Sequence, residues 1–226
     1  MIYIGLDDTD TLETRGTGNL ARRIAAELRL DMPVLGVTRH QLLKDPRVPY
    51  TKNNSSAAIH IQPTQPLEII AGRVREIMLA DFIPGSDPGL CVAQAVDRAL
   101  IHFGFLAKRE VVTQEQARNL ANQHGLLLFG LGGDQSGIIG ALAAVGLAAG
   151  GEDGRYIDLG SIRDLNGLQP VEAILAAGVS AVKTISGEEV AEGVVSIEKL
   201  RPARRGGQPV AIVQRSEAHW QLLKLD

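Results

Sequence analysis

Apolar and polar positions along the first third of the chain follow strand-like and helix-like periods in turn. Three short apolar runs predict buried strands, at residues 1–5, 33–37 and 57–61. Between the first two runs, Leu20, Ile24 and Leu28 recur at helical spacing, which predicts an amphipathic helix that Thr17 is placed to cap. The same spacing predicts a second helix at residues 67–79. This stretch is therefore expected to alternate strands with helices.

The middle of the chain continues this alternation, and the last third departs from it. After a loop rich in Pro and Gly, we expect a strand, a helix, a helix opened by Thr113, and a short strand or helix-to-loop transition, at residues 90–92, 93–105, 113 onward and 126–129. Beyond about residue 154, one short helix at 171–177 is expected among strands at residues 179–185, 194–197, 209–214 and 220–225. Gly206 and Gly207 mark a turn between two of these strands.

These elements predict a mixed α/β (α+β) fold in two parts. Residues 1–150 carry the alternating strands and helices, and residues 151–226 form a small β-rich C-terminal unit. A chain of 226 residues is long enough for one large domain or two small ones that share an interface.

Composition narrows the classes of function. The formal net charge of −3 provides no overall basic field for nucleic acid, so any such binding would need a local basic patch. Cys91 is the one cysteine, which excludes an internal disulfide and a Cys-rich zinc site, and its apolar neighbours predict a buried, unreactive thiol. The chain start lacks the order of a secretory leader, and the longest apolar run, residues 137–150, is too short to span a bilayer. We therefore expect a cytoplasmic protein without a membrane partner.

Three carboxylates follow the first predicted strand within four positions. Asp7, Asp8 and Asp10 repel one another when ionised, and a divalent cation would relieve this repulsion. Mg²⁺ prefers one or two carboxylates and takes water and phosphate oxygens as its other ligands. All three acids are therefore candidate metal ligands and candidate catalytic residues.

The helix that follows the acids suggests a place for phosphate. Thr17 opens this helix, whose unpaired backbone N–H groups favour an anion, and Gly16 and Gly18 would let phosphate approach the backbone closely. The alternative is that the acids and the threonine are solvated turn and cap residues with no ligand. From the residues alone, both interpretations stay open.

A glycine-rich segment at residues 130–140 is a second candidate for phosphate. Gly133, Ser136 and Gly137 are the candidate binding residues, and a helix start near Ser136 could hold phosphate or a small amine. The segment fits neither common nucleotide-binding glycine motif. Its alternative role is close packing, through a stripe of small residues formed by Gly137, Gly140, Ala141 and Ala144.

Two other groups of residues have weaker interpretations. The basic cluster could contact nucleic-acid phosphates, or it could be an exposed hairpin; it consists of Lys199, Arg201, Arg204 and Arg205. The histidines lack metal-binding spacing and are expected to be structural or surface residues; they are His40, His60, His102, His124 and His219.

Three blocks in order carry a resemblance to a known family. The stretch Gly-Leu-Asp-Asp-Thr-Asp at residues 5–10, with Thr17 at the start of a helix, resembles the opening of the archaeal tRNA(Ile) agmatinylcytidine synthetases. Residues 48–57 loosely resemble that family's Pro-Tyr-Lys-Thr-Arg-Gly-Asn-Gly-Ala segment. Residues 137–146 are similar to its Gly-Leu-Ile-Gly-Ala-Leu-Ala-Ala-Val-Gly stretch nearly residue for residue.

The resemblance implies a kinase-like module joined to a ferredoxin-like second part, and a site that uses ATP. It implies that Thr17 contacts or accepts the γ-phosphoryl group, that Asp7, Asp8 and Asp10 serve ATP and Mg²⁺, and that Lys52 is a counter-charge for phosphate. The family's OB-fold and zinc ribbon, which grip tRNA, have no counterpart in this sequence.

The sequence therefore predicts an ATP- and Mg²⁺-dependent phosphoryl-transfer enzyme with a nucleotide as partner. Because the RNA-gripping domains have no counterpart, a small or nucleotide-like acceptor is expected in preference to RNA. The alternatives are a non-catalytic nucleotide-binding protein and a tRNA-binding accessory protein. The oligomeric state does not follow from the sequence.

Overall fold

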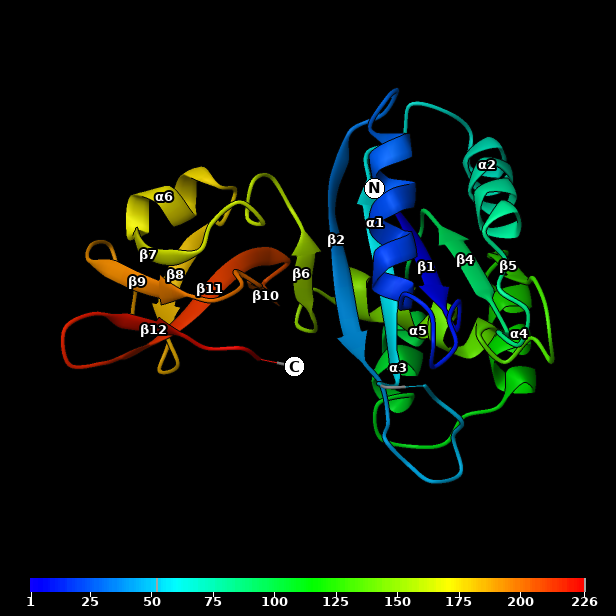
Figure 1. The fold of residues 1–226 in the computed structure, drawn as a ribbon. Coiled ribbons are helices and arrows are strands. Elements are labelled where there is room, and N and C mark those ends of the chain that lie inside the picture. The colour runs from blue at the N-terminus through cyan, green and yellow to red at the C-terminus, as the bar shows by residue number, and fades with distance from the viewer. Residues whose placement is uncertain (52, 226) are drawn as a thin grey trace.

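The computed structural model describes residues 1–51 and 53–225, which form two unequal parts side by side (Figure 1). The larger part has a sheet covered by helices on both faces, and the smaller one, called here the C-terminal unit (residues 151–225), consists mainly of strands. The mixed α/β class predicted from the sequence is confirmed. The division at residue 150 stays a prediction.

The larger part begins with a β-α-β-β-α-β order. Its elements are β1 (Ile2–Asp7), α1 (Thr17–Leu28), β2 (Val34–Gln41), β3 (Ser55–Ile61), α2 (Leu67–Ala80) and β4 (Gly89–Ala93). The strands lie in the order β4-β1-β3-β2 with antiparallel neighbours, which is the ferredoxin-like arrangement. The resemblance implied a ferredoxin-like unit in the second part, whereas the structure has this strand order at the start of the chain. The pattern of apolar residues could not correct this, because it predicts strands but not which strands pair.

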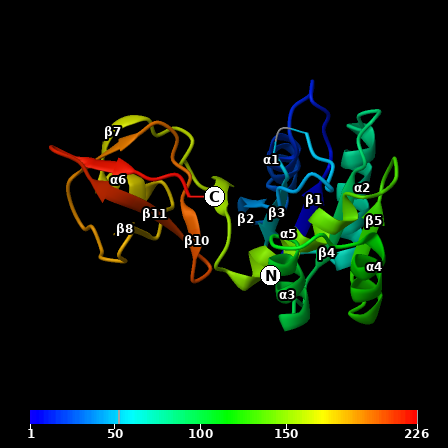
Figure 2. The ribbon, with the colours of Figure 1, turned by 90° about the horizontal axis from the view of Figure 1, so that it is seen from below.

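Helices cover the two faces of this sheet in two groups. The helices α1 and α2 lie on one face, and the other face carries α3 (Arg98–Leu106), α4 (Gln114–Gln123) and α5 (Ile138–Gly150) (Figures 1 and 2). The strand β5 (Leu127–Gly130) extends the sheet beside β4. Among the described residues, no helix has the length and apolar character needed to cross a membrane.

The alternation along β1 decides what each face meets. Ile2, Ile4 and Leu6 are fully buried in the core formed with α1 and α2. The intervening positions, Tyr3, Gly5 and Asp7, face the second group of helices. Asp7, the last residue of the strand, is thus directed toward α5.

The C-terminal unit continues the sheet beyond β2 and has its own hydrophobic core. Its elements are β6 (Arg155–Asp158), β7 (Gly167–Pro170), α6 (Val171–Ala176), β8 (Ala181–Thr184), β9 (Val194–Ile197), β10 (Ala203–Arg205), β11 (Gln208–Arg215) and β12 (Trp220–Leu222). The strand β6 connects the two parts, because it pairs with β2 on one side and with β10 on the other. The predicted turn at Gly206 and Gly207 is confirmed between β10 and β11.

Two local predictions need correction. The helix expected from residue 93 begins at Arg98, because the Asp97 carboxylate accepts hydrogen bonds from the N–H groups of Ala99 and Leu100 and fixes the start there. Thr17 does not cap α1. It is the first residue of the helix, and Gly16 occupies the cap position without a side-chain hydrogen bond.

Candidate functional site

The acidic loop starts where β1 ends. Asp8 follows the strand with a φ of 51°, a left-handed conformation that is uncommon for residues other than glycine and turns the chain out of the sheet. Asp7 lies against the first turn of α5, and Gly140 makes room for it. A Cβ atom on Gly140 would lie 1.7 Å from Oδ2 of Asp7, so any larger residue would displace the carboxylate.

Asp10 and Thr17 form the centre of a hydrogen-bonded group at the start of α1. The Thr17 hydroxyl donates to Oδ1 of Asp10 at 3.1 Å, and the Thr17 backbone N–H donates to the same oxygen at 3.2 Å. The hydroxyl also accepts from the hydroxyl of Thr9 at 3.2 Å. Thr51 donates to the other oxygen of Asp10 at 3.2 Å. The Asp10 carboxylate thus takes the place of a helix cap and fixes the Thr17 hydroxyl, which is almost fully buried.

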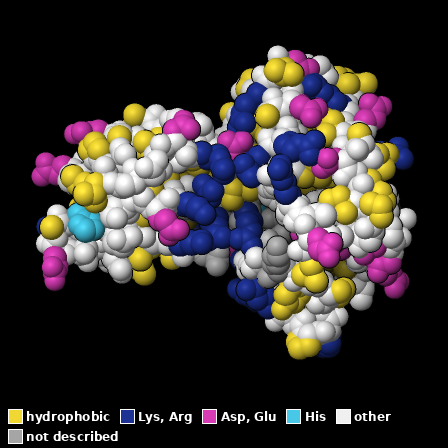
Figure 3. All heavy atoms as spheres, viewed as in Figure 1, with side chains coloured by type: hydrophobic (Ala, Val, Ile, Leu, Met, Phe, Trp, Pro, Cys, Tyr) yellow, Lys and Arg dark blue, Asp and Glu magenta, His cyan; other side chains and the backbone are white. Residues whose placement is uncertain are grey.

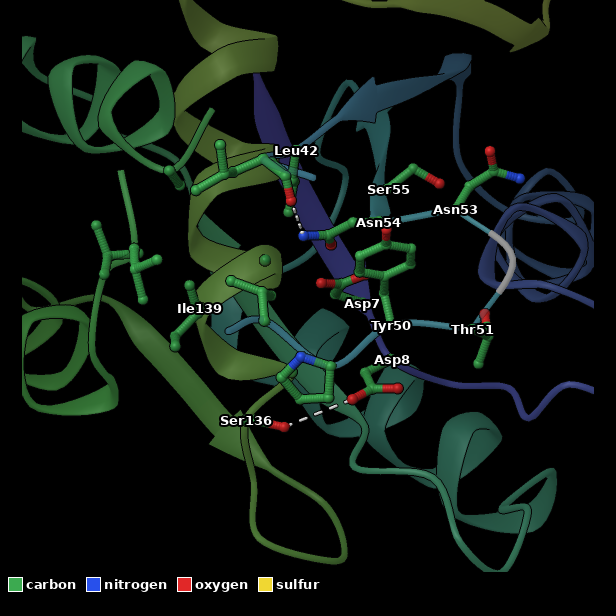
Figure 4. Close-up of a pocket in the computed structure, with 18 of the residues that line it drawn as sticks. Asp7, Asp8, Leu42, Tyr50, Thr51, Asn53, Asn54, Ser55, Ser136 and Ile139 are labelled. Atoms are coloured by element: carbon green, nitrogen blue, oxygen red, sulfur yellow. Dashed lines mark hydrogen bonds between the residues drawn. The ribbon is translucent and has the colours of Figure 1, made fainter. Parts of the chain in front are cut away.

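A cavity of about 170 Å³ opens between these acids and the opposite loop. Asp7, Asp8, Asp10 and Thr17 line it together, with Ser136, Gly137 and Gly140 from the start of α5. Figure 4 shows Asp8 and Ser136 on one side, linked by a hydrogen bond of 3.5 Å, with Tyr50 and Thr51 of the loop after β2 close by. A wider hollow of about 540 Å³ adjoins it and shares Asp8, Asp10 and the residues 49–51.

The second half of the cavity is apolar. Its walls come from the loop between β2 and β3, from the segment that follows α3, and from α5; the apolar residues are Leu42, Leu43, Val48, Pro49, Ala107, Val111, Val112 and Ile139. The cavity therefore joins a cluster of carboxylates to a surface suited to a flat or aliphatic group.

Burial and the negative charge of neighbouring acids both disfavour the ionised forms of Asp7 and Asp8. Burial, with a further contribution from Asp8, raises the pKa of Asp7 to about 8. Burial, followed by the charges of Asp87 and Asp10, raises the pKa of Asp8 to about 6. Arg47 also lines the cavity, but its guanidinium is engaged by Asp45. A bound cation would favour the ionised form of both Asp7 and Asp8.

The arrangement fits a metal bound jointly by protein and ligand. Within the described residues, no group of three or more His, Cys, Asp or Glu side chains has the arrangement of a metal site. Both oxygens of Asp10 already accept hydrogen bonds, whereas Asp7 and Asp8 carry most of the electrostatic conflict. Mg²⁺ commonly takes only one or two carboxylates and completes its shell with water and phosphate oxygens. The donor set is therefore suited to Mg²⁺ that arrives with a phosphorylated ligand.

The glycine-rich segment has both of its expected roles. Gly137 lines the cavity, and it also packs tightly, because a Cβ atom there would lie 2.4 Å from the carbonyl oxygen of Asp87. Gly133 lies outside the cavity lining. Its φ of 55° and the Asp87 carboxylate beside it leave no room for a side chain. The N–H groups of Gly137, Ile138 and Ile139 already donate to backbone carbonyls. This helix start therefore offers phosphate fewer hydrogen-bond donors than the sequence predicts.

Three other predicted ligand residues have different outcomes. Gly16 adjoins Asp10 and does not line the cavity, and Gly18 faces Ile157 of β6, so that its missing side chain lets α1 pack on that strand. Lys52 lies outside the described residues. The roles of these residues in binding stay predictions.

Two residues that hold the loops of the site in place, Thr51 and Asp87, were not among the residues predicted from the sequence. Thr51 binds Asp10 directly, although the block at 48–57 had drawn attention only to Lys52. Asp87 accepts from the N–H of Asp134 at 2.6 Å and so fixes the loop that carries Ser136. The signal for Asp87 was present: it is the acid inside the predicted loop at residues 84–89.

A second polar cluster, outside the cavity lining, involves side chains of β2 and β3. Thr38 contacts the imidazoles of His40 and His60, each with an Oγ1–Nε2 distance of 2.8 Å. The Asp153 carboxylate bonds Nδ1 of His40 at 2.9 Å and also pairs with Lys108. The prediction that the histidines are structural or surface residues is confirmed for His40 and His60, which are fully buried here.

The chain is similar to known proteins over about two-thirds of its length. No protein-family model matches the chain. It is 26% identical over 152 residues to the tRNA(Ile2) 2-agmatinylcytidine synthetase TiaS of Cenarchaeum symbiosum, covering 66% of this chain and 34% of that protein. It is 27% identical over 150 residues to an uncharacterised protein of Methanocaldococcus jannaschii, covering 65% of this chain and 50% of that protein. The chain thus spans a third to a half of the length of these relatives.

Solved structures show the same fold. The crystal structure of the TiaS–tRNA(Ile2)–ATP complex matches with a TM-score of 0.56 and 22% identity, over 64% of this chain and 36% of that one. The crystal structure of a tRNA fluorescent labelling enzyme matches with a TM-score of 0.56 and 23% identity, over 64% of this chain and 35% of that one. The resemblance indicated by three sequence blocks is therefore confirmed over about two-thirds of the chain. The preference for a small acceptor over RNA has no support here, because these relatives bind or modify tRNA.

Proposed function

We propose that this chain is an ATP- and Mg²⁺-dependent phosphoryl-transfer enzyme whose acceptor is a small or nucleotide-like group, free or within an RNA. One observation carries the proposal: the buried Thr17 hydroxyl is fixed by Asp10 on the wall of a cavity that Asp7 and Asp8 also line. The similarity to TiaS, which has been crystallised with tRNA and ATP, supports the same class of ligand.

The residues divide into two roles. Asp10 accepts the Thr17 hydroxyl hydrogen bond and is positioned to take its proton, which would leave the oxygen free to contact or accept a γ-phosphoryl group. If Thr17 is the acceptor, its oxygen bonds to the γ-phosphorus of ATP as the bond between that phosphorus and the departing ADP breaks. Asp7 and Asp8 would hold Mg²⁺, which neutralises phosphate charge when bound. Ser136 keeps Asp8 oriented toward the cavity.

The apolar half of the cavity is the proposed acceptor side. Tyr50 and Ile139 provide a flat and an aliphatic contact beside the carboxylates, as a base or another planar group would require. Gly16, Gly18, Gly133, Gly137 and Lys52 remain proposed nucleotide contacts. Of these, Gly137 has the strongest support, because it lines the cavity.

Turnover and covalent labelling test the proposal without knowledge of the acceptor. Purified protein is incubated with ATP and Mg²⁺, and ADP release and intact mass are measured. We expect Mg²⁺-dependent ATP consumption in the wild type, and a loss of at least about 100-fold in Thr17→Ala and Asp8→Asn. A one-phosphoryl mass increase that Thr17→Ala lacks would identify Thr17 as an acceptor.

Matched substitutions away from the cavity provide the controls. Thr64→Ala and Asp164→Asn make the same chemical changes at exposed positions and should retain wild-type turnover. ATP binding without turnover in the wild type would favour a non-catalytic nucleotide-binding protein. RNA binding without ATP binding would favour a tRNA-binding accessory protein. Either result rejects the enzyme.

A further inference from the structure

The two parts of the molecule meet along a seam whose two faces have different polar contacts. Figure 3 shows Lys and Arg side chains gathered along the seam on the face that carries α1. There Arg29 of α1 pairs with Asp158 of β6 at 2.9 Å, but both side chains are partly exposed. On the other face, Asp153 of the C-terminal unit is buried and meets Lys108 and His40 of the larger part. Breaking a buried contact of this kind costs far more than breaking an exposed one, so this face holds the two parts in register.

Both partners of this buried carboxylate adjoin the cavity. Two segments at residues 42–43 and 107–112, called here the wall segments, form much of its apolar half. His40 lies two residues before the first wall segment, and Lys108 belongs to the second. The wall segments also meet directly, because the N–H of Leu43 donates to the first carbonyl of the second segment at 3.2 Å. One carboxylate outside the cavity therefore holds residues of, or next to, both wall segments.

The C-terminal unit fixes the position of this carboxylate. Asp153 lies in the linker from α5 to β6, and the hairpin of β10 and β11 holds that linker. The carbonyl oxygens of Gly151 and Gly154 accept from backbone N–H groups of the hairpin at 3.0 and 2.9 Å. The Glu152 carboxylate accepts from a third N–H of the hairpin at 2.7 Å. Because its neighbours on both sides are bonded to one hairpin, Asp153 moves with the C-terminal unit.

The same hairpin also holds the end of α5. Arg204, one of the basic residues that the sequence analysis considered for nucleic-acid phosphates, is buried. Its guanidinium donates to the carbonyl oxygens of Ala148 at 2.9 Å and of Gly207 at 2.6 Å. This member of the basic cluster is therefore engaged within the protein.

The linker is packed against β2 without free space. A Cβ atom on Gly154 would lie 2.6 Å from Nδ1 of His40 and 2.7 Å from the carbonyl oxygen of Arg39. The φ of 84° at Gly154 also favours glycine there. A displacement of the linker would therefore reach β2 and the wall segment that follows it.

The contacts of Asp153 use both of its oxygens. Oδ1 bonds Nδ1 of His40 at 2.9 Å, and Oδ2 accepts from the Lys108 ammonium. His40 can then accept the Thr38 hydroxyl at Nε2, at 2.8 Å, so that the neutral imidazole is satisfied at both nitrogens. An amide at position 153 has one acceptor oxygen, and its NH₂ group would face one of the two partners. Only a carboxylate therefore holds both partners at once.

We propose that Asp153 is a positioning residue for the apolar half of the cavity, because it ties both wall segments to the C-terminal unit. The wall takes its shape only while that unit is seated on the sheet. The inference rests on the proposed function for the role of this half as the acceptor side. Within residues 1–51 and 53–225, none beyond Gly140 lines the cavity, so the C-terminal unit acts through Asp153 and not by direct contact.

Hydrogen exchange of single amides, followed by NMR, tests this in the ligand-free protein. The N–H of Leu43 joins the two wall segments, and the N–H of Thr17, which donates to Asp10, reports the acidic side. We expect Asp153→Asn and Lys108→Gln to accelerate exchange at Leu43 by at least about tenfold, as the loss of a hydrogen bond between charged groups implies. Exchange at Thr17 should equal that of the wild type, because its opening leaves the Asp153 contacts intact.

A conservative variant and matched controls complete the test. Lys108→Arg keeps the ion pair and should restore wild-type exchange at Leu43. Asp153→Asn combined with Lys108→Gln should accelerate exchange by less than the product of the two single effects, because the two residues share one contact. Lys44→Gln removes an exposed cation beside the same wall, and Asp164→Asn repeats the amide substitution at an exposed position; both should exchange as the wild type does.

Two results would overturn the inference. Acceleration confined to amides at the centre of β1 and β3, with none at Leu43, would mean that Asp153 stabilises the whole fold without positioning the wall. Equal acceleration at Leu43 in Lys44→Gln would mean that any loss of charge near the wall has this effect. If Asp153→Asn does not fold, Lys108→Gln decides alone, because the Lys108 side chain is partly exposed.

The result is separable from the enzyme proposal, because exchange is measured without ATP. ATP turnover in the wild type together with unchanged exchange at Leu43 in both variants rejects the positioning role and leaves the proposed function standing. Accelerated exchange at Leu43 in a protein that does not consume ATP supports the positioning role and rejects the enzyme.

Discussion

Two buried polar clusters that face the second group of helices differ in how their charge is balanced. In the cavity cluster, Asp7 and Asp8 face other acids, and burial raises the pKa of both. In the histidine cluster, Asp153 meets Lys108 and His40, which hold its pKa below the ordinary value although burial acts in the opposite direction. The negative charge of the histidine cluster is balanced by Lys108 and by a hydrogen bond with His40, whereas that of the cavity cluster is not balanced by a cation among the described residues. Unbalanced charge therefore distinguishes a candidate ligand site from a structural network.

The largest effect is expected from a substitution that removes the central acid of the histidine cluster. Asp153→Ala should lower the free energy of unfolding by about 3–5 kcal/mol, because it leaves Lys108 without its partner and His40 without its acceptor. Denaturant unfolding measures the change. Asp164→Ala, at an exposed position of the C-terminal unit, should stay within about 0.5 kcal/mol of the wild type. A loss below about 1 kcal/mol at Asp153 would contradict the comparison.

Acidification should weaken the same cluster. Burial lowers the pKa of His40 and His60, so the unfolded chain binds protons more readily than the folded one as the pH falls below about 6.5. Each imidazole then costs up to about 1.4 kcal/mol of stability per pH unit. Unfolding at pH 7.5 and 5.5 should show this loss, with a smaller one in His60→Gln. The exposed His102→Gln should keep the wild-type slope, and an equal reduction there would reject the assignment.

The cavity cluster should have the opposite response to pH. The folded pKa of Asp7 is about 8, above its ordinary value of 3.8, so between these values the folded state holds a proton that the unfolded chain has lost. Stability therefore falls as the pH rises through this window. Asp7→Asn should stabilise the ligand-free protein by about 1–2 kcal/mol at pH 8 and by less at pH 5. Thermal unfolding at both pH values measures the change in stability. If Asp7→Asn destabilises the protein at both, the ionised Asp7 carboxylate is not unfavourable in the folded state.

The smallest effect is expected at Ser56, which lies next to His40 in the sheet. Within the described residues, the buried Ser56 Oγ has no hydrogen-bond partner, and Ser56 pairs with His40 across β2 and β3. Ser56→Ala should therefore leave stability unchanged or raise it by up to about 1 kcal/mol. Its neighbour Ser55 accepts from Arg39 at 2.9 Å on the other face of the strand, so Ser55→Ala should lower stability. Chemical denaturation of the pair should show opposite signs.

Local pattern predicted most elements of this fold. The strand before the acidic loop and the apolar stripe of α1 after it could be predicted because burial imposes a period on adjacent residues, and the glycine pair predicted the turn at Gly206. Cys91 was expected to be buried and unreactive, and burial raises its pKa to about 12. The strands β6, β7 and β10 escaped prediction, because they are only three or four residues long and contain charged or turn-forming residues.

The candidate site was readable in part for the same reason. Asp7, Asp8, Asp10 and Thr17 are neighbours in sequence, so their gathering could be anticipated from the loop between a strand and a helix. Thr51 and Asp87 come from other loops, and only the antiparallel pairing of β1 with β3 and β4 brings those loops to the same end of the sheet.

Two glycines, Gly5 and Gly140, allow α5 to pack closely on β1 and so set the distance between them at the site. A side chain on Gly5 would lie 2.0 Å from the carbonyl oxygen of Ala141, and one on Gly140 would meet the Asp7 carboxylate. The helix therefore rests directly on the strand, and the width of the cavity floor is set by backbone thickness. An alanine at either position would push α5 away from β1 and widen the cavity. This would change the geometry of the site without replacing any of its polar residues.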